Sequence, residues 1–315
     1  MYLKTPYLCG MLARKEHGGI VATKSLLEAA WAESTLKAYK GWTAKYFSYC
    51  EASGLDPYDL SAVISWLESL AGRHKLSSIE QAAAAVRFLY KANGKGNPFE
   101  AEPLRLLMRA LRRKLGAAKK QVKPITPAQL SCMRWDAGPK GLRDKALILI
   151  GFGAALRVSE LIALQYSDIE ITPEGVILTI RRSKTDQAGK GRLVAIPKSE
   201  GPLCPVRALE AYLRVRGRQD GPLFQSLHKS KLTGRPLSRQ AVDALIKDYM
   251  DRLGLDYKAY STHSMRAGFA TAAALNGADL ETIASQTGHK SMEVLRGYIR
   301  RANLFQRNAA KLVLG

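Results

Sequence analysis

The sequence is poor in cysteine and acidic residues, and it has no long apolar run. Its 315 residues include 4 cysteines, and no two of them form a CxxC pair. This scatter suggests neither a zinc site nor a disulfide framework, and it favours a reducing, intracellular setting. No run of about 18 apolar residues occurs, and the first residues lack the apolar core of a signal peptide. The chain is therefore predicted to be cytoplasmic and to have no membrane partner.

The scarcity of acidic residues leaves a large positive charge. Lys and Arg number 49 against 27 Asp and Glu, which gives a net charge of +22. Up to residue 125 there are 20 basic and 10 acidic residues, and after it 29 and 17. Such a charge implies a polyanionic partner, and nucleic acid is the first candidate because neutralising phosphates releases counterions. Since both parts carry the excess, both are predicted to face the nucleic acid, and the protein is predicted to be associated with the nucleoid.

The first part of the chain has helical periodicity with signals at the helix ends. Helices are predicted from Ser34 to Gly54, from a cap at Ser61, from Ser77 or Ser78 to Asn93, and from Glu102 to Gly116. The last of these places three arginines on one face, which is either a solvated stripe or a phosphate-contacting surface. The overall charge favours phosphate contact by Arg109, Arg112 and Arg113.

A basic, proline-containing stretch then separates two domains. Residues 117–126 follow a helix-ending glycine and include Lys119 and Lys120, which are predicted to contact DNA. The predicted organisation is an extension at 1–24, a helical DNA-binding domain at 25–116, a basic linker at 117–126 and a second domain at 127–315.

The second domain is predicted to be mostly helical with a small antiparallel sheet. Thr126 and Pro127 open a helix, and a helix, a turn and another helix surround Arg157. The segments GVILTIRR and RLVAIP are rich in β-branched residues and predict a hairpin, and helices resume at Pro205.

Residues 260–301 combine helix-end signals with groups that can do chemistry. Thr262 is a candidate cap for a helix ending at Asn276, Asp279 caps one that Gly288 ends, and Ser291 caps a third. Taken alone, each candidate has an ordinary structural interpretation: a local ion pair for Arg157 with Glu160, a solvated loop lysine for Lys184 or Lys190, a helix cap for His263 and His289, a surface arginine for Arg266 and a core aromatic for Tyr298.

Together these groups fit metal-free phosphoryl transfer. A tyrosine with a pKa near 10 is ionised to about 0.1% at pH 7, so forming its phenolate costs about 4 kcal/mol. Arginine and histidine donors can stabilise that anion and the charge of a five-coordinate phosphorane, each contributing about 3 to 4 kcal/mol. A mobile lysine can protonate the leaving alkoxide. The sequence has no DxD-type carboxylate cluster or metal-ligand set, so neither a metal nor another cofactor is predicted.

The sequence resembles the tyrosine recombinase (phage integrase) family. The resemblance is carried in order by ALRVSEL, RRSKTDQ, THSMRAGFAT, TGHKS and LRGYIR, over about residues 126–315. It implies that Tyr298 attacks the scissile phosphate to give a 3′-phosphotyrosine, with Lys184 rather than Lys190 as general acid. It further implies that Arg157, Arg266 and His289 hold phosphate oxygens, that His263 is a base or hydrogen-bond partner, and that Glu160 orients Arg157 or His263.

The resemblance also implies an architecture and partners. A two-domain clamp without an arm-binding domain would bind a specific inverted-repeat site in double-stranded DNA as a homotetramer. A C-terminal helix would pack into a neighbouring protomer, or alternatively fold back on its own domain. Two other functions stay open at this stage: a DNA-binding or architectural protein that kept the fold, and the same cleavage chemistry used to relax supercoils or to close hairpin telomeres.

Overall fold

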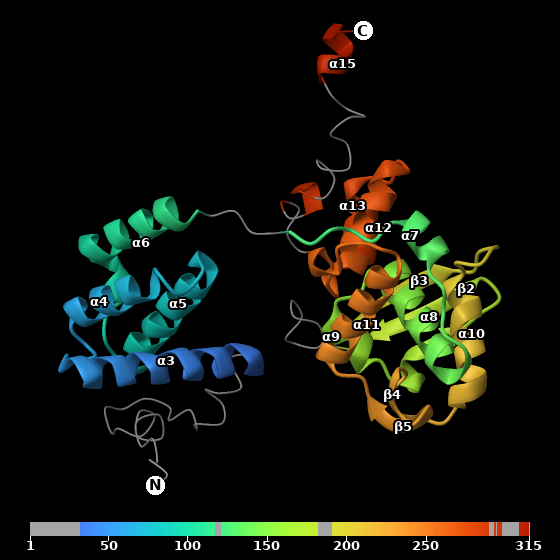
Figure 1. Cartoon of the computed structure of the whole chain (residues 1–315), viewed down its shortest axis with the longest axis horizontal. Coiled ribbons are helices and arrows are strands. Elements are labelled where there is room, and N and C mark those ends of the chain that lie inside the picture. Colours follow the sequence, from blue (N-terminus) through green and yellow to red (C-terminus); the bar gives the residue numbers. More distant parts are fainter. Residues whose placement is uncertain are drawn as a thin grey trace. The chain divides into compact units, whose positions relative to one another are not determined.

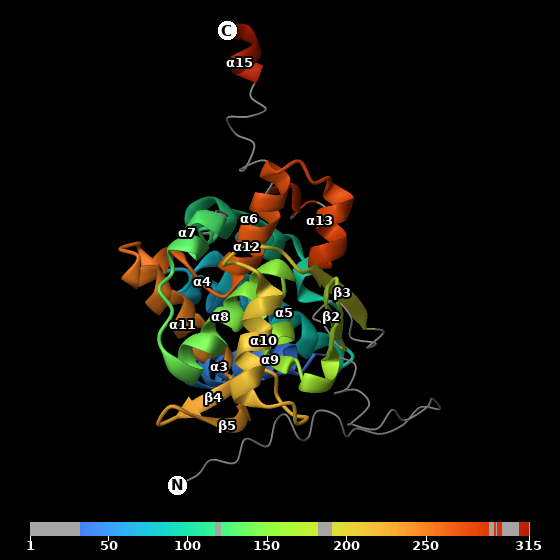
Figure 2. The ribbon, with the colours of Figure 1, turned by 90° about the vertical axis from the view of Figure 1, so that its right-hand side faces the viewer.

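The chain is mainly helical, with a small antiparallel sheet, as the sequence predicts (Figures 1 and 2). The computed structural model describes residues 32–116, 121–181, 191–289, 293, 295–297 and 309–314. The chain divides into two compact units, Met1–Lys120 and Gln121–Gly315. Among the described residues, no helix is both long and apolar enough to cross a membrane. The predicted domain limits and the clamp stay predictions.

The first unit is a helical bundle around an aromatic core. It contains α3 (Glu33–Ser53), α4 (Leu60–Leu70), α5 (Leu76–Ala92), the 3₁₀ helix η1 (Pro98–Glu100) and α6 (Glu102–Leu115). Gly54 ends α3 with a φ of +64°, as its left-handed cap position requires. The predicted helix starts at Ser61 and Ser77 or Ser78 are wrong, because α4 follows Asp59 and α5 follows Lys75. Because Leu76 is buried in the core, α5 begins at Leu76, before the two serines.

In the second unit, α8 lies at the centre and contacts both α10 and α12 (Figure 1). The elements are α7 (Pro127–Cys132), α8 (Gly138–Gly153), α9 (Val158–Ala163), η2 (Tyr166–Asp168), β1 (Ile169–Ile171), β2 (Gly175–Ile180), β3 (Arg192–Pro197), α10 (Pro205–Arg216), β4 (Gln225–His228), β5 (Lys231–Pro236), α11 (Arg239–Arg252), η3 (Tyr257–Ala259), α12 (His263–Leu275), α13 (Leu280–Thr287) and α15 (Ala309–Leu314).

The predicted hairpin is confirmed. Strands β2 and β3 pair antiparallel, with Ile180 opposite Arg192, and this register places Arg192 at the first position of β3. Alternate residues of both strands are buried in the core of the unit, among them Val176 and Val194. Two features were not predicted: β1, which pairs with β2, and a separate β4–β5 hairpin. These strands are short and weakly alternating, so their sequence signal is small.

The helix ends predicted after residue 260 agree largely with the structure. Asp279 caps α13 by accepting a hydrogen bond from the Thr282 N–H at 2.8 Å, and Gly288 ends it with a φ of +63°. Thr262 does precede α12, but its side chain makes no capping bond. The predicted cap at Ser291 lies outside the described residues, whereas Leu295 is buried in a small cluster with Ile283 and Ala284.

Candidate active site

Arg157 stands in a turn that ends α8 and begins α9. Ala155 adopts a left-handed φ of +49°, which costs an L-residue about 1 kcal/mol and reverses the chain after α8. The Leu156 N–H then donates to the Gly151 carbonyl at 3.1 Å and closes the turn. Arg157 follows as the N-cap of α9 with extended backbone angles. The turn therefore fixes the backbone position from which the Arg157 side chain extends.

A buried carboxylate holds Arg157 from within the same turn. Glu160 Oε1 accepts from Arg157 Nη1 at 2.7 Å, and Glu160 Oε2 accepts from the Arg157 backbone N–H at 3.0 Å. The Glu160 side chain is fully buried, whereas that of Arg157 is 16% exposed. The local ion pair considered from the sequence is thus present. Its geometry leaves the guanidinium at the edge of solvent, where it can meet an anion.

Arg266 reaches the same region from α12 and is buried. Its Nη1 donates to the Ala155 carbonyl at 2.7 Å and also to the Thr287 carbonyl. One guanidinium thereby joins the turn before Arg157 to the last residue of α13. Arg157 makes a parallel link, because its Nη2 donates to the Gly288 carbonyl at 3.4 Å. The two arginines therefore converge on the C-terminal end of α13, whose carbonyls attract cations.

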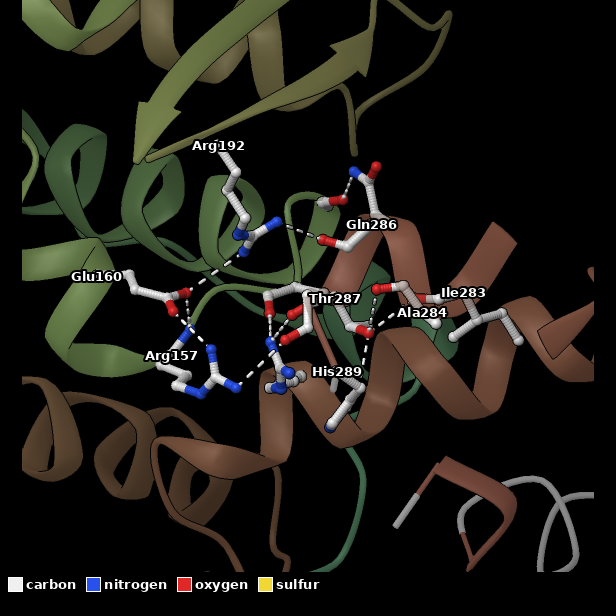
Figure 3. Close-up of polar contacts among 12 residues, drawn as sticks. Arg157, Glu160, Arg192, Ile283, Ala284, Gln286, Thr287 and His289 are labelled. Carbon is white, nitrogen blue, oxygen red and sulfur yellow. Dashed lines mark hydrogen bonds and ion pairs between the residues drawn. The ribbon is translucent and has the colours of Figure 1, made fainter. Parts of the chain in front are cut away.

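His289 follows directly after this helix end. Its backbone N–H donates to the Ala284 carbonyl at 3.2 Å, and its Nδ1 lies 2.7 Å from the Thr287 hydroxyl oxygen. Figure 3 shows the imidazole close to Thr287, on the side of α13 that faces Arg157. Burial lowers the pKa of His289 to about 4, and the charges of Arg266, Arg157 and Arg192 contribute to the shift. His289 is therefore neutral at physiological pH.

This neutrality gives a testable pH dependence. Because the folded-state pKa is about 4 and the ordinary value is 6.5, the unfolded chain takes up a proton in this interval and the folded chain does not. The free energy of unfolding should therefore fall as the pH drops from 6.5 to 4. In an NMR titration, the His289 ring signal, identified by its loss in His289→Gln, should not shift between pH 5.5 and 8. A midpoint above pH 6 would contradict the assignment.

The structure places the predicted site residues unevenly. Four of them gather around the end of α13: Arg157, Glu160, Arg266 and His289. His263 is the exposed first residue of α12, and its backbone N–H donates to the Ser261 hydroxyl. The arginines predicted to contact DNA are exposed on α6 of the other unit. The remaining predicted residues lie outside the described ranges: Lys119, Lys120, Lys184 and Tyr298.

Sequence reasoning missed two contributors. Arg192 at the start of β3 contacts Glu160, and Thr287 holds the imidazole of His289. The available sequence signal for Arg192 was its place as the one charged residue, at the first position of an otherwise apolar strand. No motif or spacing in the sequence pointed to Thr287. Among the residues that the structure describes, no group of three or more His, Cys, Asp or Glu is placed to hold a metal ion. The assembled groups are instead cationic N–H donors and a neutral imidazole, a set suited to a phosphate.

Comparison with known proteins identifies the family. The phage integrase family model matches residues 118–304. An integrase/recombinase xerD homolog from Selenomonas ruminantium is 34% identical over 321 residues, which cover 98% of this chain and 94% of that protein.

Two solved structures share the fold. The Tn1549 transposon integrase in complex with transposon right end DNA has a TM-score of 0.60 at 18% identity, covering 89% of this chain and 95% of that one. XerH bound to a palindromic difH substrate has a TM-score of 0.59 at 17% identity, covering 82% and 73%. With the family model spanning more than half of its length, the chain belongs to the phage integrase family, the tyrosine recombinases, and is a DNA strand-cleaving and rejoining enzyme.

Proposed function

We propose that the protein is a site-specific DNA recombinase that acts through a covalent 3′-phosphotyrosine, without metal or ATP. The observation that carries the proposal is the convergence of Arg157, Arg266 and His289 at one helix end, although they are distant in sequence. The matching integrase and XerH structures, titled as complexes with transposon end DNA and with a palindromic substrate, add support.

In the proposed cleavage step, the Tyr298 hydroxyl oxygen attacks the scissile phosphorus, a P–O bond to tyrosine forms, and the P–O5′ bond of DNA breaks. His263 assists removal of the phenol proton, and Lys184 protonates the leaving 5′ oxygen. The same steps in reverse, with a new 5′-hydroxyl as nucleophile, rejoin the strand and free the tyrosine. No net phosphate bond is lost, so the cycle needs no ATP.

The arginines supply the main electrostatic assistance in this scheme. Attack adds negative charge to the non-bridging oxygens, and each preorganised donor aimed at them contributes about 3 to 4 kcal/mol. Arg157 and Arg266 are preorganised because backbone carbonyls and Glu160 already fix their guanidinium groups. Two such donors offset more than the roughly 4 kcal/mol needed to form a phenolate at pH 7.

The role proposed for His289 sets its tautomer. A neutral imidazole donates to a phosphate oxygen only through the nitrogen that carries the proton. If Nε2 carries the proton and donates to DNA, Nδ1 must be the acceptor. The nearby Thr287 hydroxyl must then donate a hydrogen bond to Nδ1. That hydroxyl also lies 2.7 Å from the Ile283 carbonyl and 3.4 Å from the Ala284 carbonyl, so its single proton has three competing acceptors. Binding of a phosphate would favour the arrangement in which Thr287 donates to His289.

Trapping the intermediate tests the proposal. The binding site would first be found by sequencing DNA that stays attached to the protein. A nicked duplex carrying this site should then leave protein on a 3′ end in the presence of a chelator. Absence of an adduct on a site whose binding has been verified would overturn the proposal. Plasmids with one site or two would separate recombination, which exchanges segments, from relaxation of supercoils.

Helix α6 is proposed to contact DNA phosphates. Arg109, Arg112 and Arg113 are exposed, and Arg112 is paired with Glu80 at 3.1 Å. Each phosphate contact steepens the dependence of log affinity on log salt by about 0.9, so replacing all three arginines by Ala should flatten the slope by about 2 to 3. Titrations at several salt concentrations measure this slope. Glu80→Gln, which frees Arg112, is a control that should not flatten it, and an unchanged slope in the triple variant would mean that the arginines only face solvent.

The inverted-repeat site and the tetramer are part of the same proposal. In the described part of α15, Val313 and Leu314 are 80% and 84% exposed. Exposed apolar side chains of this kind favour the docking of the C-terminal helix on a neighbouring protomer over folding back.

A further inference from the structure

Arg192 lies on β3, a strand that carries none of the proposed catalytic residues. Its side chain contacts both α9 and the end of α13. Its Nη1 donates to the Gln286 carbonyl at 3.0 Å, and its Nη2 lies 3.4 Å from Glu160 Oε2. Its side chain is 22% exposed, and burial lowers its pKa. Figure 3 shows the guanidinium between Glu160 and the end of α13. The contacts thus link β3, α9 and α13.

The approach of Arg192 to α13 is unusually close and depends on a glycine. A Cβ atom at Gly288 would lie 3.0 Å from Arg192 Nε and 3.1 Å from its Cζ, which is tighter than nine in ten real Cβ contacts. Gly288 also has the left-handed φ that ends the helix. The residue directly before His289 therefore leaves room both for the turn and for the guanidinium.

Glu160 is shared between two arginines. Arg157 occupies Oε1, while Arg192 lies at Oε2 beside the Arg157 backbone N–H. A fully buried carboxylate needs such partners, because an unpaired charge in the interior is costly. With Arg192 present, both carboxylate oxygens of Glu160 have partners. The carboxylate is then fixed, and the range of orientations open to the Arg157 guanidinium is smaller.

Packing of the sheet against α13 does not depend on Arg192 alone. The Gln286 side-chain amide donates to the Gly153 carbonyl at 3.0 Å and to the Ala195 carbonyl at 3.1 Å. These bonds tie α13 to α8 and β3 through a different side chain. Loss of the Arg192 guanidinium should therefore leave the helix in place while releasing Glu160 and Arg157.

The geometry points to Arg192 as a positioning residue for strand cleavage: it couples the Arg157–Glu160 pair to the end of α13 and so sets Arg157 and His289 against the same phosphate. This inference rests on the proposed function. Among the residues that the structure describes, the charged groups that lower the pKa of His289 are Arg266 of α12, Arg157 at the start of α9 and Arg192 of β3. Removing the Arg192 charge should consequently also make His289 easier to protonate.

The test compares Arg192→Gln and Arg192→Lys with wild type at saturating DNA. Arg192→Gln should slow adduct formation by about 100-fold, the scale of a small misplacement of reacting groups, with little change in DNA affinity. Its His289 ring should titrate at a higher pH in NMR of the DNA-free protein. Arg192→Lys keeps the positive charge, so the pKa of His289 should stay as in wild type. The lysine ammonium cannot replace the planar guanidinium fork, so the rate of adduct formation should lie between those of wild type and Arg192→Gln.

The matched control is Arg207→Gln, which removes an exposed arginine that donates to the Ser199 carbonyl at 2.9 Å. It should match wild type in rate and in the His289 titration. A wild-type rate in Arg192→Gln, or a rate loss explained by weaker DNA binding or unfolding, would overturn the positioning role. If wild type itself formed no adduct, the proposed function would fail, whereas the His289 titrations would still report on Arg192.

Discussion

Tyr298→Phe is expected to bind its DNA site as wild type does and to form no covalent adduct. Phe keeps the ring but lacks the oxygen that the proposed step uses as nucleophile. The expected loss of adduct formation is at least about 10⁴-fold. Gel shift measures the binding, and denaturing electrophoresis with an end-labelled nicked duplex measures the adduct.

Tyr257→Phe is a suitable control, since it removes the hydroxyl of another tyrosine, 38% exposed on η3. It should retain the adduct. Adduct formation by Tyr298→Phe at a comparable rate would assign the nucleophile to another residue. Recombination retained by this variant would point instead to a DNA-binding protein that acts without cleavage.

Arg266→Gln should combine a catalytic loss with a loss of stability. Removing one donor to the developing charge costs about 10²- to 10³-fold in rate. The Ala155 and Thr287 carbonyls also lose the guanidinium that joins them, and each buried acceptor left without a donor costs about 1 to 3 kcal/mol. Because burial and then Arg266 are the main causes of the low pKa of His289, that pKa should rise in the variant. Adduct kinetics, denaturant unfolding and NMR measure the three effects.

Arg216→Gln provides the matched control for stability. Arg216 is also buried and donates to backbone carbonyls, among them those of Gln219 and Gly221, but it belongs to the end of α10. It should destabilise the fold without slowing the chemistry at a temperature where the protein is folded. Equal rate losses in both variants would show that Arg266 acts only through stability.

Much of the fold is encoded in short stretches of sequence. Gly54 and Gly288 end α3 and α13 in the left-handed conformation that glycine adopts most readily, and the side chains of Thr126 and Asp279 cap the starts of α7 and α13. The abundance of β-branched residues in two short segments predicted the β2–β3 hairpin. Capping interactions of this kind join residues within about four positions of each other. They can therefore be predicted without knowing how the rest of the chain packs. They fail where burial overrides them, as at the start of α5, where Leu76 is pulled into the core.

The sequence by itself determined the candidate reactive groups and the helix ends beside Arg157, Arg266 and His289, because residue type and local spacing set both. Only the tertiary structure decided how these groups act together. Arg157 reaches Gly288 across 131 positions, and Arg192 reaches Gln286 across 94. Contacts of this kind depend on how α8, β3, α12 and α13 pack, and no local period encodes them. The low pKa of His289 has the same origin, since burial and three arginines from separate elements produce it.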